Sequence, residues 1–208
     1  IPDDPEVADV VQEWVDIAFE GFIEQGFDPN RVVTTTTEPL DGRESTIRNR
    51  ETNLGSLIAE AFLREGDNAD LAIFNGGSVR IDDVLPTGDI SQYDLIRVMP
   101  FGGNVLTVGV KGSVLAAALT QGVANRGTGG FLQTAGVSSG SDTWMIGGEA
   151  LDPDRTYRVA TNDFLVTGLE TGLDFFNVEE NPDMELIATH RDVRMATIDE
   201  LQRRFGSP

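Results

Sequence analysis

The sequence predicts an α/β or α+β domain in which a mixed β-sheet packs against helices. Segments with apolar residues three and four positions apart indicate helices, and short β-branched or apolar runs indicate strands. The two kinds of segment alternate along the chain, which is typical of this fold class. With 208 residues, 39% of them hydrophobic, the chain is long enough to bury a core. The sequence contains no internal repeat and no linker-like stretch except near residues 36–44.

The first half of the chain predicts two helices and two strands. An apolar stripe that includes Trp14 and Phe19 indicates the first helix, which Gly26 can end, and we expect this stripe to be buried. A second stripe, from Leu54 to Phe62, indicates the other helix. The expected elements are, in order, a helix over residues 6–26, a strand over Val32–Thr37, a helix from Asn49 to near Gly66 and a strand over Leu71–Phe74.

The second half predicts a similar alternation. Residues 127–148 are rich in glycine and serine, so we expect a loop there with one or two strands. The other expected elements are a short helix over Ile90–Val98, a strand over Val105–Val110, a helix over Ser113–Val123, a strand over Tyr157–Thr161 and a final amphipathic helix over Val193–Phe205.

The charge of the chain argues against some classes of partner. Thirty-five acidic against 15 basic side chains give a net charge of -20, which disfavours nucleic acid polymers and membrane surfaces, because both are polyanions. No apolar stretch reaches the roughly twenty residues of a transmembrane helix, so we expect no membrane insertion. Lys111 is the only lysine. An acidic, lysine-poor surface suits a high-salt habitat, and an ordinary coding bias is the alternative.

Several kinds of catalytic and metal site are missing from the sequence. Cysteine is absent, which excludes disulfides, thiolate metal sites and a cysteine nucleophile. His190 is the sole histidine, so a Ser-His-Asp triad or a histidine-rich metal centre would depend on one imidazole. No phosphate-binding loop or dinucleotide fingerprint occurs. We therefore expect no catalytic residues, no metal site and no cofactor in this chain.

The stretch STIRNRETNLGSL places two arginines immediately before a predicted helix. A helix N-terminus offers free backbone N–H groups, so an anion bound there would also gain from Arg48 and Arg50. The alternative is that these arginines form ordinary ion pairs with Glu44 and Glu51. Taken alone, the stretch favours the ion pairs.

The stretch FNGGSVR, residues 74–80, follows a short apolar run and ends in an arginine. Its glycines let the backbone approach a ligand closely, and the Asn75 amide both donates and accepts hydrogen bonds. A plain tight turn with a surface arginine explains the same residues.

Two phenylalanines occupy bent segments. Phe101 lies between Pro100 and two glycines, and Phe164 follows a predicted strand. Each ring is either a core anchor or a platform on which a flat base can stack, and phenylalanine is usually buried.

In their order, these motifs resemble the C-terminal domain of the 5′-nucleotidase family, which includes bacterial UDP-sugar hydrolases and animal ecto-5′-nucleotidases. The resemblance covers residues 34–178 approximately and implies a fold like that of this domain. It is carried by Arg48-x-Arg50-Glu51-x-Asn53-x-Gly55, Asn75-Gly76-Gly77-x-x-Arg80, Pro100-Phe101-Gly102, Gly130-Phe131-Leu132-Gln133 and Asn162-x-Phe164-Leu165.

The resemblance implies a division of labour between two domains. In the family, an N-terminal metallophosphoesterase domain holds two divalent metal ions, and the C-terminal domain binds the nucleotide. Residues 34–208 would then be the nucleotide-binding domain, and residues 1–33 a helix that connects the two domains. The chain opens on Ile1 and an acidic, proline-containing stretch, so we expect a piece of a longer protein. The resemblance also implies an extracellular or periplasmic location.

The resemblance further assigns roles to individual residues. Phe101 and Phe164 would stack on the two faces of the base. Asn75 would hydrogen-bond the base or the ribose, and Gly77 would let the backbone come close. Arg48 and Arg80 would contact phosphate and ribose, since an arginine fork suits phosphate oxygens.

Two positions depart from the family pattern. Ser78 stands where the family usually has a third glycine. The family's Gly-Gly-Asp-Gly run, whose aspartate binds the ribose hydroxyls, is replaced here, and either Glu170 or Asp174 could take that role. The resemblance thus implies the substrate-binding domain of a nucleotidase that is inactive alone. A stand-alone nucleotide- or nucleoside-binding module, or a hydrolase of nucleotide-sugars or cyclic nucleotides, is the alternative.

Overall fold

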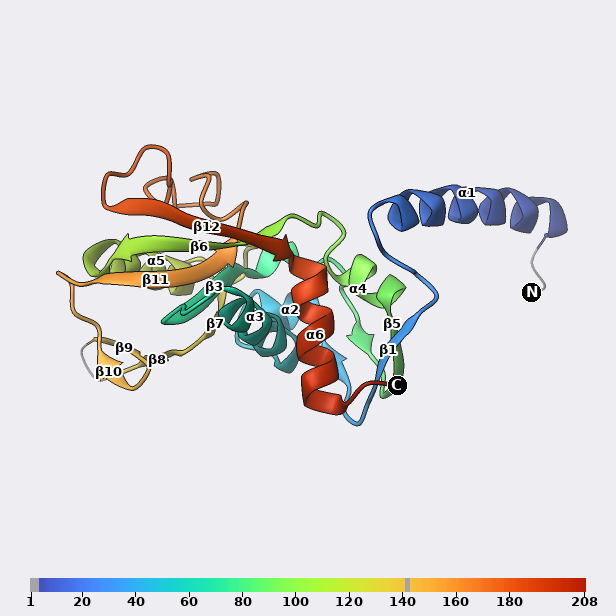
Figure 1. Ribbon diagram of the computed structural model, residues 1–208, viewed down its shortest axis with the longest axis horizontal. Coiled ribbons are helices and arrows are strands. Elements are labelled where there is room, and N and C mark those ends of the chain that lie inside the picture. The colour runs from blue at the N-terminus through green and yellow to red at the C-terminus, as the bar shows by residue number, and fades with distance from the viewer. Residues whose placement is uncertain (1–3, 141–142) are drawn as a thin grey trace.

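A five-stranded mixed sheet forms the centre of the molecule (Figure 1), which we describe from a computed structural model for residues 4–140 and 143–208. The strand order is β12-β6-β11-β3-β7, in which β11 and β3 are parallel and the other neighbours are antiparallel. This arrangement confirms the predicted α/β class with a mixed sheet. The strands are β3 (Leu71–Asn75), β6 (Asn104–Lys111), β7 (Leu132–Ala135), β11 (Thr156–Asn162) and β12 (Met184–Asp192).

Helices cover both faces of this sheet. Side chains alternate between the faces along a strand, and β3 illustrates this: Leu71 and Ile73 belong to one buried cluster, whereas Phe74 belongs to the other. Helix α5 (Gly112–Ala124) packs on the first face through Leu115. Helices α3 (Asn53–Glu65) and α6 (Val193–Phe205) lie on the opposite face.

Helix α3 shows why its sequence predicted it well. Thr52 caps its start, because the threonine hydroxyl accepts a hydrogen bond from the Gly55 backbone N–H at 3.0 Å. The helix ends where the Gly66 N–H donates to the Phe62 carbonyl. The apolar stripe of the helix is buried: Leu54, Leu57, Ile58, Ala61 and Phe62.

The first predicted helix is present as α1 (Pro5–Glu24), and it extends away from the rest of the molecule (Figure 1). Its apolar stripe was expected to be buried, but most of the stripe is exposed. Phe22, near the end of the helix, packs against the core, and Phe27 after it is buried. The exposed apolar side chains of α1 are Val7, Val10, Val11, Trp14, Ile17 and Ile23.

Two small sheets and a short helix lie near α3 and α6, on the same side of the central sheet. Strand β1 (Val32–Thr36) pairs with β5 (Gly88–Ser91), and β2 (Leu40–Asp41) pairs with β4 (Val84–Leu85). The predicted helix over Ile90–Val98 starts later, as α4 (Gln92–Val98), because Ser91 and Asp94 form a capping box. The remaining short elements are α2 (Glu44–Ile47), the 3₁₀ turn η1 (Gly76–Ser78), β8 (Val137–Ser139), β9 (Trp144–Ile146) and β10 (Glu149–Ala150).

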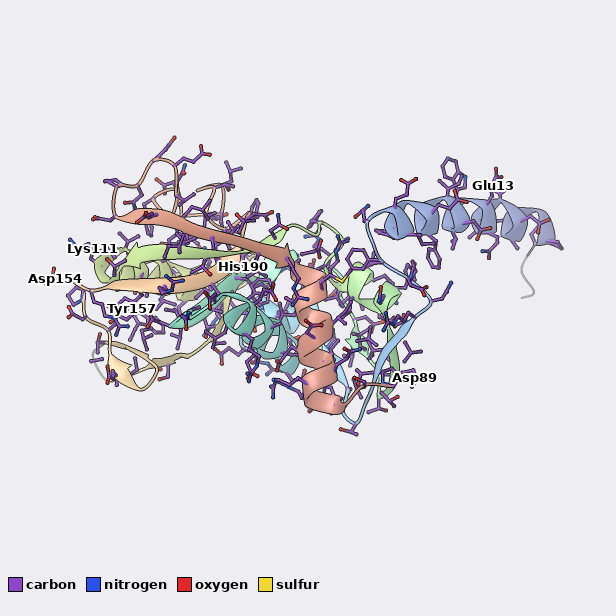
Figure 2. All side chains as sticks on the ribbon, in the orientation of Figure 1. Glu13, Asp89, Lys111, Asp154, Tyr157 and His190 are labelled. Atoms are coloured by element: carbon purple, nitrogen blue, oxygen red, sulfur yellow. The ribbon has the colours of Figure 1, made fainter. Side chains whose placement is uncertain are left out.

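The sequence did not predict β12. This strand lies at the edge of the sheet, and most of its residues are exposed or half-buried, so it lacks the apolar alternation of a half-buried strand. His190 lies on β12 (Figure 2), and its Nε2 is 2.8 Å from the Thr107 hydroxyl on β6. The sole histidine therefore joins two neighbouring strands. Residues 127–148 contain β7, β8 and β9 where one or two strands were expected.

Candidate functional site

A cavity of about 480 Å³ opens beyond the carboxyl ends of β3 and β11. Because these strands are parallel, their carboxyl ends lie at the same edge of the sheet, which is where open α/β sheets bind ligands. The cavity is lined by Phe62, Asn75, Gly77, Ser78, Arg80, Met99, Phe101, Gly102, Gly103, Gly129, Asn162, Asp163, Phe164, Glu170 and Val193.

Both phenylalanines singled out in the sequence line this cavity. Phe101 is 75% exposed and Phe164 is 41% exposed, so neither ring is a core anchor. Phe101 follows α4 in a turn whose next two residues, Gly102 and Gly103, have φ of +63° and +93°. Glycine adopts such values at no steric cost, because it lacks a Cβ. The glycines thus bend the chain so that a large apolar ring stands at the cavity.

The inner part of the cavity carries a polar network. Asn75 is 4% exposed, and its Nδ2 donates to Glu170 Oε2 at 3.0 Å. Its Oδ1 accepts from the Ser78 hydroxyl at 2.6 Å and from Asn162 Nδ2 at 3.3 Å. Asn162 Nδ2 also donates to Ser78 Oγ at 3.0 Å. With its oxygen used twice and one N–H used by Glu170, the Asn75 amide keeps one N–H for a further acceptor.

The two glycines of FNGGSVR serve a close approach between protein segments. The Gly76 N–H donates to the Phe131 carbonyl and the Gly77 N–H to the Gly129 carbonyl, both at 2.8 Å. A Cβ on Gly77 would lie 3.0 Å from the Gly129 Cα, and one on Gly76 would lie 2.8 Å from a backbone oxygen. Gly77 lines the cavity as well, so its lack of a side chain keeps this part of the wall thin.

The two predicted phosphate ligands differ in their surroundings. Arg80 is exposed and lines the cavity, and its guanidinium carbon lies 5.7 Å from the centre of the Phe101 ring. Arg48 does not belong to the lining and forms an ion pair with Glu44. Its Nε is buried and has no hydrogen-bond partner among the described residues. The structure thus has the ion pair that the sequence offered as the alternative for Arg48.

The two candidate ribose ligands are also separated. Glu170 lies in the cavity wall and is bonded to Asn75, whereas Asp174 is exposed and is not part of the lining. Glu170 Oε1 also accepts from the Thr171 backbone N–H at 2.9 Å, which fixes the orientation of the carboxylate. Of the two, only Glu170 is placed beside the other site residues.

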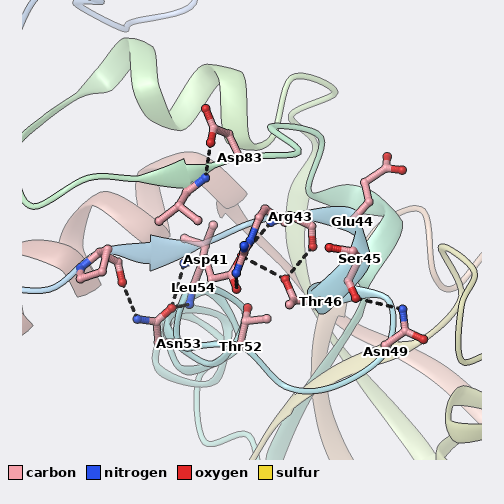
Figure 3. A network of polar contacts seen from close by, with 12 residues as sticks. Asp41, Arg43, Glu44, Ser45, Thr46, Asn49, Thr52, Asn53, Leu54 and Asp83 are labelled. Carbon is pink, nitrogen blue, oxygen red and sulfur yellow. Dashed lines mark hydrogen bonds and ion pairs between the residues drawn. The ribbon is translucent and has the colours of Figure 1, made fainter.

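The loop that carries Arg48 is held by a network around Asp41 (Figure 3). Arg43 donates to both carboxylate oxygens of Asp41, at 2.9 and 2.8 Å, and the Thr46 hydroxyl donates at 3.0 Å. These hydrogen bonds, above all those from Arg43, lower the pKa of Asp41 to about 2. Asn53 ties α3 to the same loop, since its Oδ1 accepts from the Asp41 N–H. The network fixes the segment between β2 and α3, which lies against the η1 turn (Gly76–Ser78).

Asn162 and Asp163 were not among the predicted site residues. Both line the cavity, at the end of β11 and just before Phe164. Their position at the carboxyl end of a buried strand is the signal that could have found them. Within residues 4–140 and 143–208, no group of three or more His, Asp or Glu side chains could hold a metal ion. No helix in that part of the chain is long and apolar enough to span a membrane.

A comparison with known families decides the relationship of the chain. The family described as "5′-nucleotidase, C-terminal domain" matches residues 32–177. The chain belongs to this family. The match contains every motif on which the resemblance was based, from Arg48 to Leu165.

Curated relatives agree with this assignment. The trifunctional nucleotide phosphoesterase protein YfkN of Bacillus subtilis is 35% identical in an alignment that covers 67% of this chain and 11% of that protein. Protein UshA of Yersinia enterocolitica is 38% identical over 62% of this chain and 24% of that protein. The human 5′-nucleotidase is 32% identical over 66% of this chain and 25% of that protein. The chain thus spans a quarter or less of the length of these relatives.

A solved structure supports the fold over nearly the whole chain. The 5′-nucleotidase precursor from Thermus thermophilus superposes with a TM-score of 0.77 and 25% identity, covering 96% of this chain and 40% of that one. The mixed sheet with helices on both faces is therefore the fold of a 5′-nucleotidase C-terminal domain.

Proposed function

We propose that this chain is the substrate-binding domain of a 5′-nucleotidase-type hydrolase and that it clamps a nucleotide base between Phe101 and Phe164. The observation that carries this proposal is that two solvent-exposed phenylalanines line one cavity with a polar interior. An exposed phenylalanine gains contact when a flat heterocycle covers it, and stacking on an aromatic side chain is worth about 1 to 3 kcal/mol per base. The family relationship makes a nucleotide the natural ligand.

The polar groups of the cavity fit the rest of a nucleotide. Arg80 stands beside Phe101 and offers a planar set of donors that matches phosphate oxygens. Glu170 offers carboxylate oxygens that accept from ribose hydroxyls, and Asn75 has an N–H left for a base or ribose acceptor. Arg48 would join the phosphate site only if its guanidinium left Glu44. Asp174 would reach the ribose only after a movement of its loop.

We further propose that hydrolysis takes place in an N-terminal metallophosphoesterase domain of the same polypeptide, which would hold two divalent metal ions. The chain covers only a quarter or less of the relatives' length, which leaves room for such a domain. Residues 1–33 would connect the two domains, and residues 34–208 would bind the nucleotide. The exposed apolar stripe on α1 supports a contact with another surface. The family relationship favours an extracellular or periplasmic location.

Calorimetry on the 208-residue chain tests the binding role. We expect adenosine 5′-monophosphate to bind at least about tenfold more tightly than ribose 5-phosphate, because only the former can stack between the rings. A UDP-sugar in the same series examines the nucleotide-sugar alternative. Equal affinity for the two phosphates would contradict the clamp.

Activity measurements test the division of labour. The 208-residue chain should hydrolyse no nucleotide in the presence of Mn²⁺ or Zn²⁺, since the described residues form no metal site. Turnover by this chain would contradict the assignment of catalysis to another domain.

A further inference from the structure

One side chain, Asp163, touches both of the loops that carry the two rings. It directly precedes Phe164, and its Oδ2 accepts a hydrogen bond from the Asn104 backbone N–H at 3.1 Å. Asn104 is the first residue of β6 and follows the turn formed by Phe101, Gly102 and Gly103. A single carboxylate therefore bridges two segments that lie 59 positions apart in the sequence.

The contact between Asp163 and this turn is close. A Cβ on Gly103 would lie 2.6 Å from both carboxylate oxygens of Asp163, a distance that real Cβ atoms do not reach. Gly103 also has φ of +93°, a backbone conformation that favours glycine. The carboxylate rests directly against the backbone of the turn.

The turn is held from its other side by the start of α6. The Val193 N–H donates to the Gly103 carbonyl at 3.0 Å. A Cβ on Gly102 would lie 2.6 Å from Arg194 Nη2, and Arg194 is itself buried in an ion pair with Asp192. With α6 on one side and Asp163 on the other, the turn that bears Phe101 has little freedom to move.

We propose that Asp163 is a positioning residue that holds the Phe101 and Phe164 rings at the separation at which one flat heterocycle fits between them. This inference rests on the proposed clamp. The hydrogen bond that the Asp163 carboxylate accepts from the Asn104 N–H ties the residue before Phe164 to the end of the Phe101 turn. Loss of this bond would release one wall of the clamp without removing either ring.

Two substitutions separate the hydrogen bond from the charge. Asp163→Ala removes the acceptor and should weaken adenosine binding by about three- to tenfold in calorimetry, the loss expected for one hydrogen bond. Asp163→Asn keeps an oxygen that can accept from Asn104, so it should stay within about twofold of the unaltered chain. If Asp163→Asn lost as much adenosine affinity as Asp163→Ala, the negative charge and not the hydrogen bond would matter. That result would contradict the positioning role.

A double-mutant cycle with Phe101→Ala decides how Asp163 acts. If Asp163 works by positioning the Phe101 turn, Asp163→Ala should change adenosine affinity by less than about twofold once the ring is gone. An equal loss in both backgrounds would mean that Asp163 binds the ligand directly, and it would overturn the proposal while leaving the clamp in place. If Phe101→Ala alone left the affinity unchanged, the clamp and this proposal would both be wrong.

Asp70→Ala is the control for a general loss of stability, and it removes an ion pair with Arg155 as well. Asp70 Oδ2 also accepts from a backbone N–H, that of Arg158 at 2.8 Å, but at the start of β3, away from the cavity. This control should lower the melting temperature and leave adenosine affinity unchanged. If Asp70→Ala weakened adenosine binding as much as Asp163→Ala, the effect of Asp163 would be a general loss of stability, and the positioning role would be refuted.

Discussion

Strand β11 has an aromatic residue near each end, and the two residues have opposite surroundings. Tyr157, at the amino end (Figure 2), is 2% exposed, and its hydroxyl accepts from the Asp152 N–H at 2.8 Å. Phe164, just beyond the carboxyl end, is 41% exposed and lines the cavity. At the first end, the ring and its polar group are used by the protein itself. At the second end the ring is exposed at the cavity, where the proposed clamp needs it, so substitutions at the two ends should affect different properties.

The largest expected effect is a loss of stability at the amino end of β11, where Tyr157 is buried. Tyr157→Ala should lower the free energy of unfolding by about 3 to 5 kcal/mol, because it leaves a cavity among the residues packed around α5. Phe164→Ala should cost far less stability, since its ring is already partly in water. Denaturant unfolding of both variants measures the difference. Equal losses would show that Phe164 is a core residue and would remove the contrast.

The next largest effect is a loss of ligand affinity at the cavity, beyond the carboxyl end of β11. Phe101→Ala and Phe164→Ala should each weaken adenosine binding by about 1 to 3 kcal/mol, the value of one stacking contact. Calorimetry with the 208-residue chain measures this, and Val123→Ala, which shortens an exposed apolar side chain on α5, is the control. Unchanged affinity in both phenylalanine variants would mean that the exposed rings serve another surface.

The two arginines predicted to contact phosphate should differ in their effect on nucleotide binding. Arg80→Ala should weaken the binding of adenosine 5′-monophosphate by about 1.5 kcal/mol more than that of adenosine, because a charge-assisted hydrogen bond to phosphate is lost. Arg48→Ala should have a smaller effect on either ligand, since its guanidinium is paired with Glu44. The reverse order in calorimetry would show that Arg48 turns toward the phosphate when a nucleotide binds.

The smallest expected effect is the contribution of Asp41 to the free energy of unfolding at low pH. The folded-state pKa of Asp41 is lowered to about 2 from its ordinary value of 3.8, chiefly by hydrogen bonds from Arg43. A lowered pKa means that the stabilisation is complete above about pH 4 and is lost as the pH falls toward 2. The pair is partly exposed, so its contribution is about 1 kcal/mol or less. The difference in unfolding free energy between the unaltered chain and Asp41→Asn should shrink over this range, and a constant difference would contradict the assignment.

Local sequence patterns account for the parts of the fold that could be predicted. Helix α3 and strand β3 were expected because local patterns and caps decide them: Thr52 caps the helix, and all five residues of β3 are buried. Strand β12 was missed because an edge strand needs no apolar alternation, and its pairing with β6 supplies the hydrogen bonds that order it. The exposed stripe of α1 was expected to be buried because the pattern of a helix does not reveal which surface covers it.

Some residues of the candidate site could be predicted from the sequence, and others could not. Motif order pointed to Phe101, Phe164 and Asn75, which the fold brings to one cavity. The bond between Asn75 and Glu170 joins residues 95 positions apart, so no local spacing could choose Glu170 over Asp174. The ion pair of Arg48 depends on the neighbouring turn of α2, and the sequence left it open beside the phosphate role.

A crystal structure of the 208-residue chain with adenosine 5′-monophosphate would show whether the two phenylalanines form a clamp. We expect the adenine between the Phe101 and Phe164 rings, with both rings roughly parallel to it and the phosphate beside Arg80. An adenine bound away from the two rings, or rings that remain uncovered while the nucleotide occupies another surface, would contradict it.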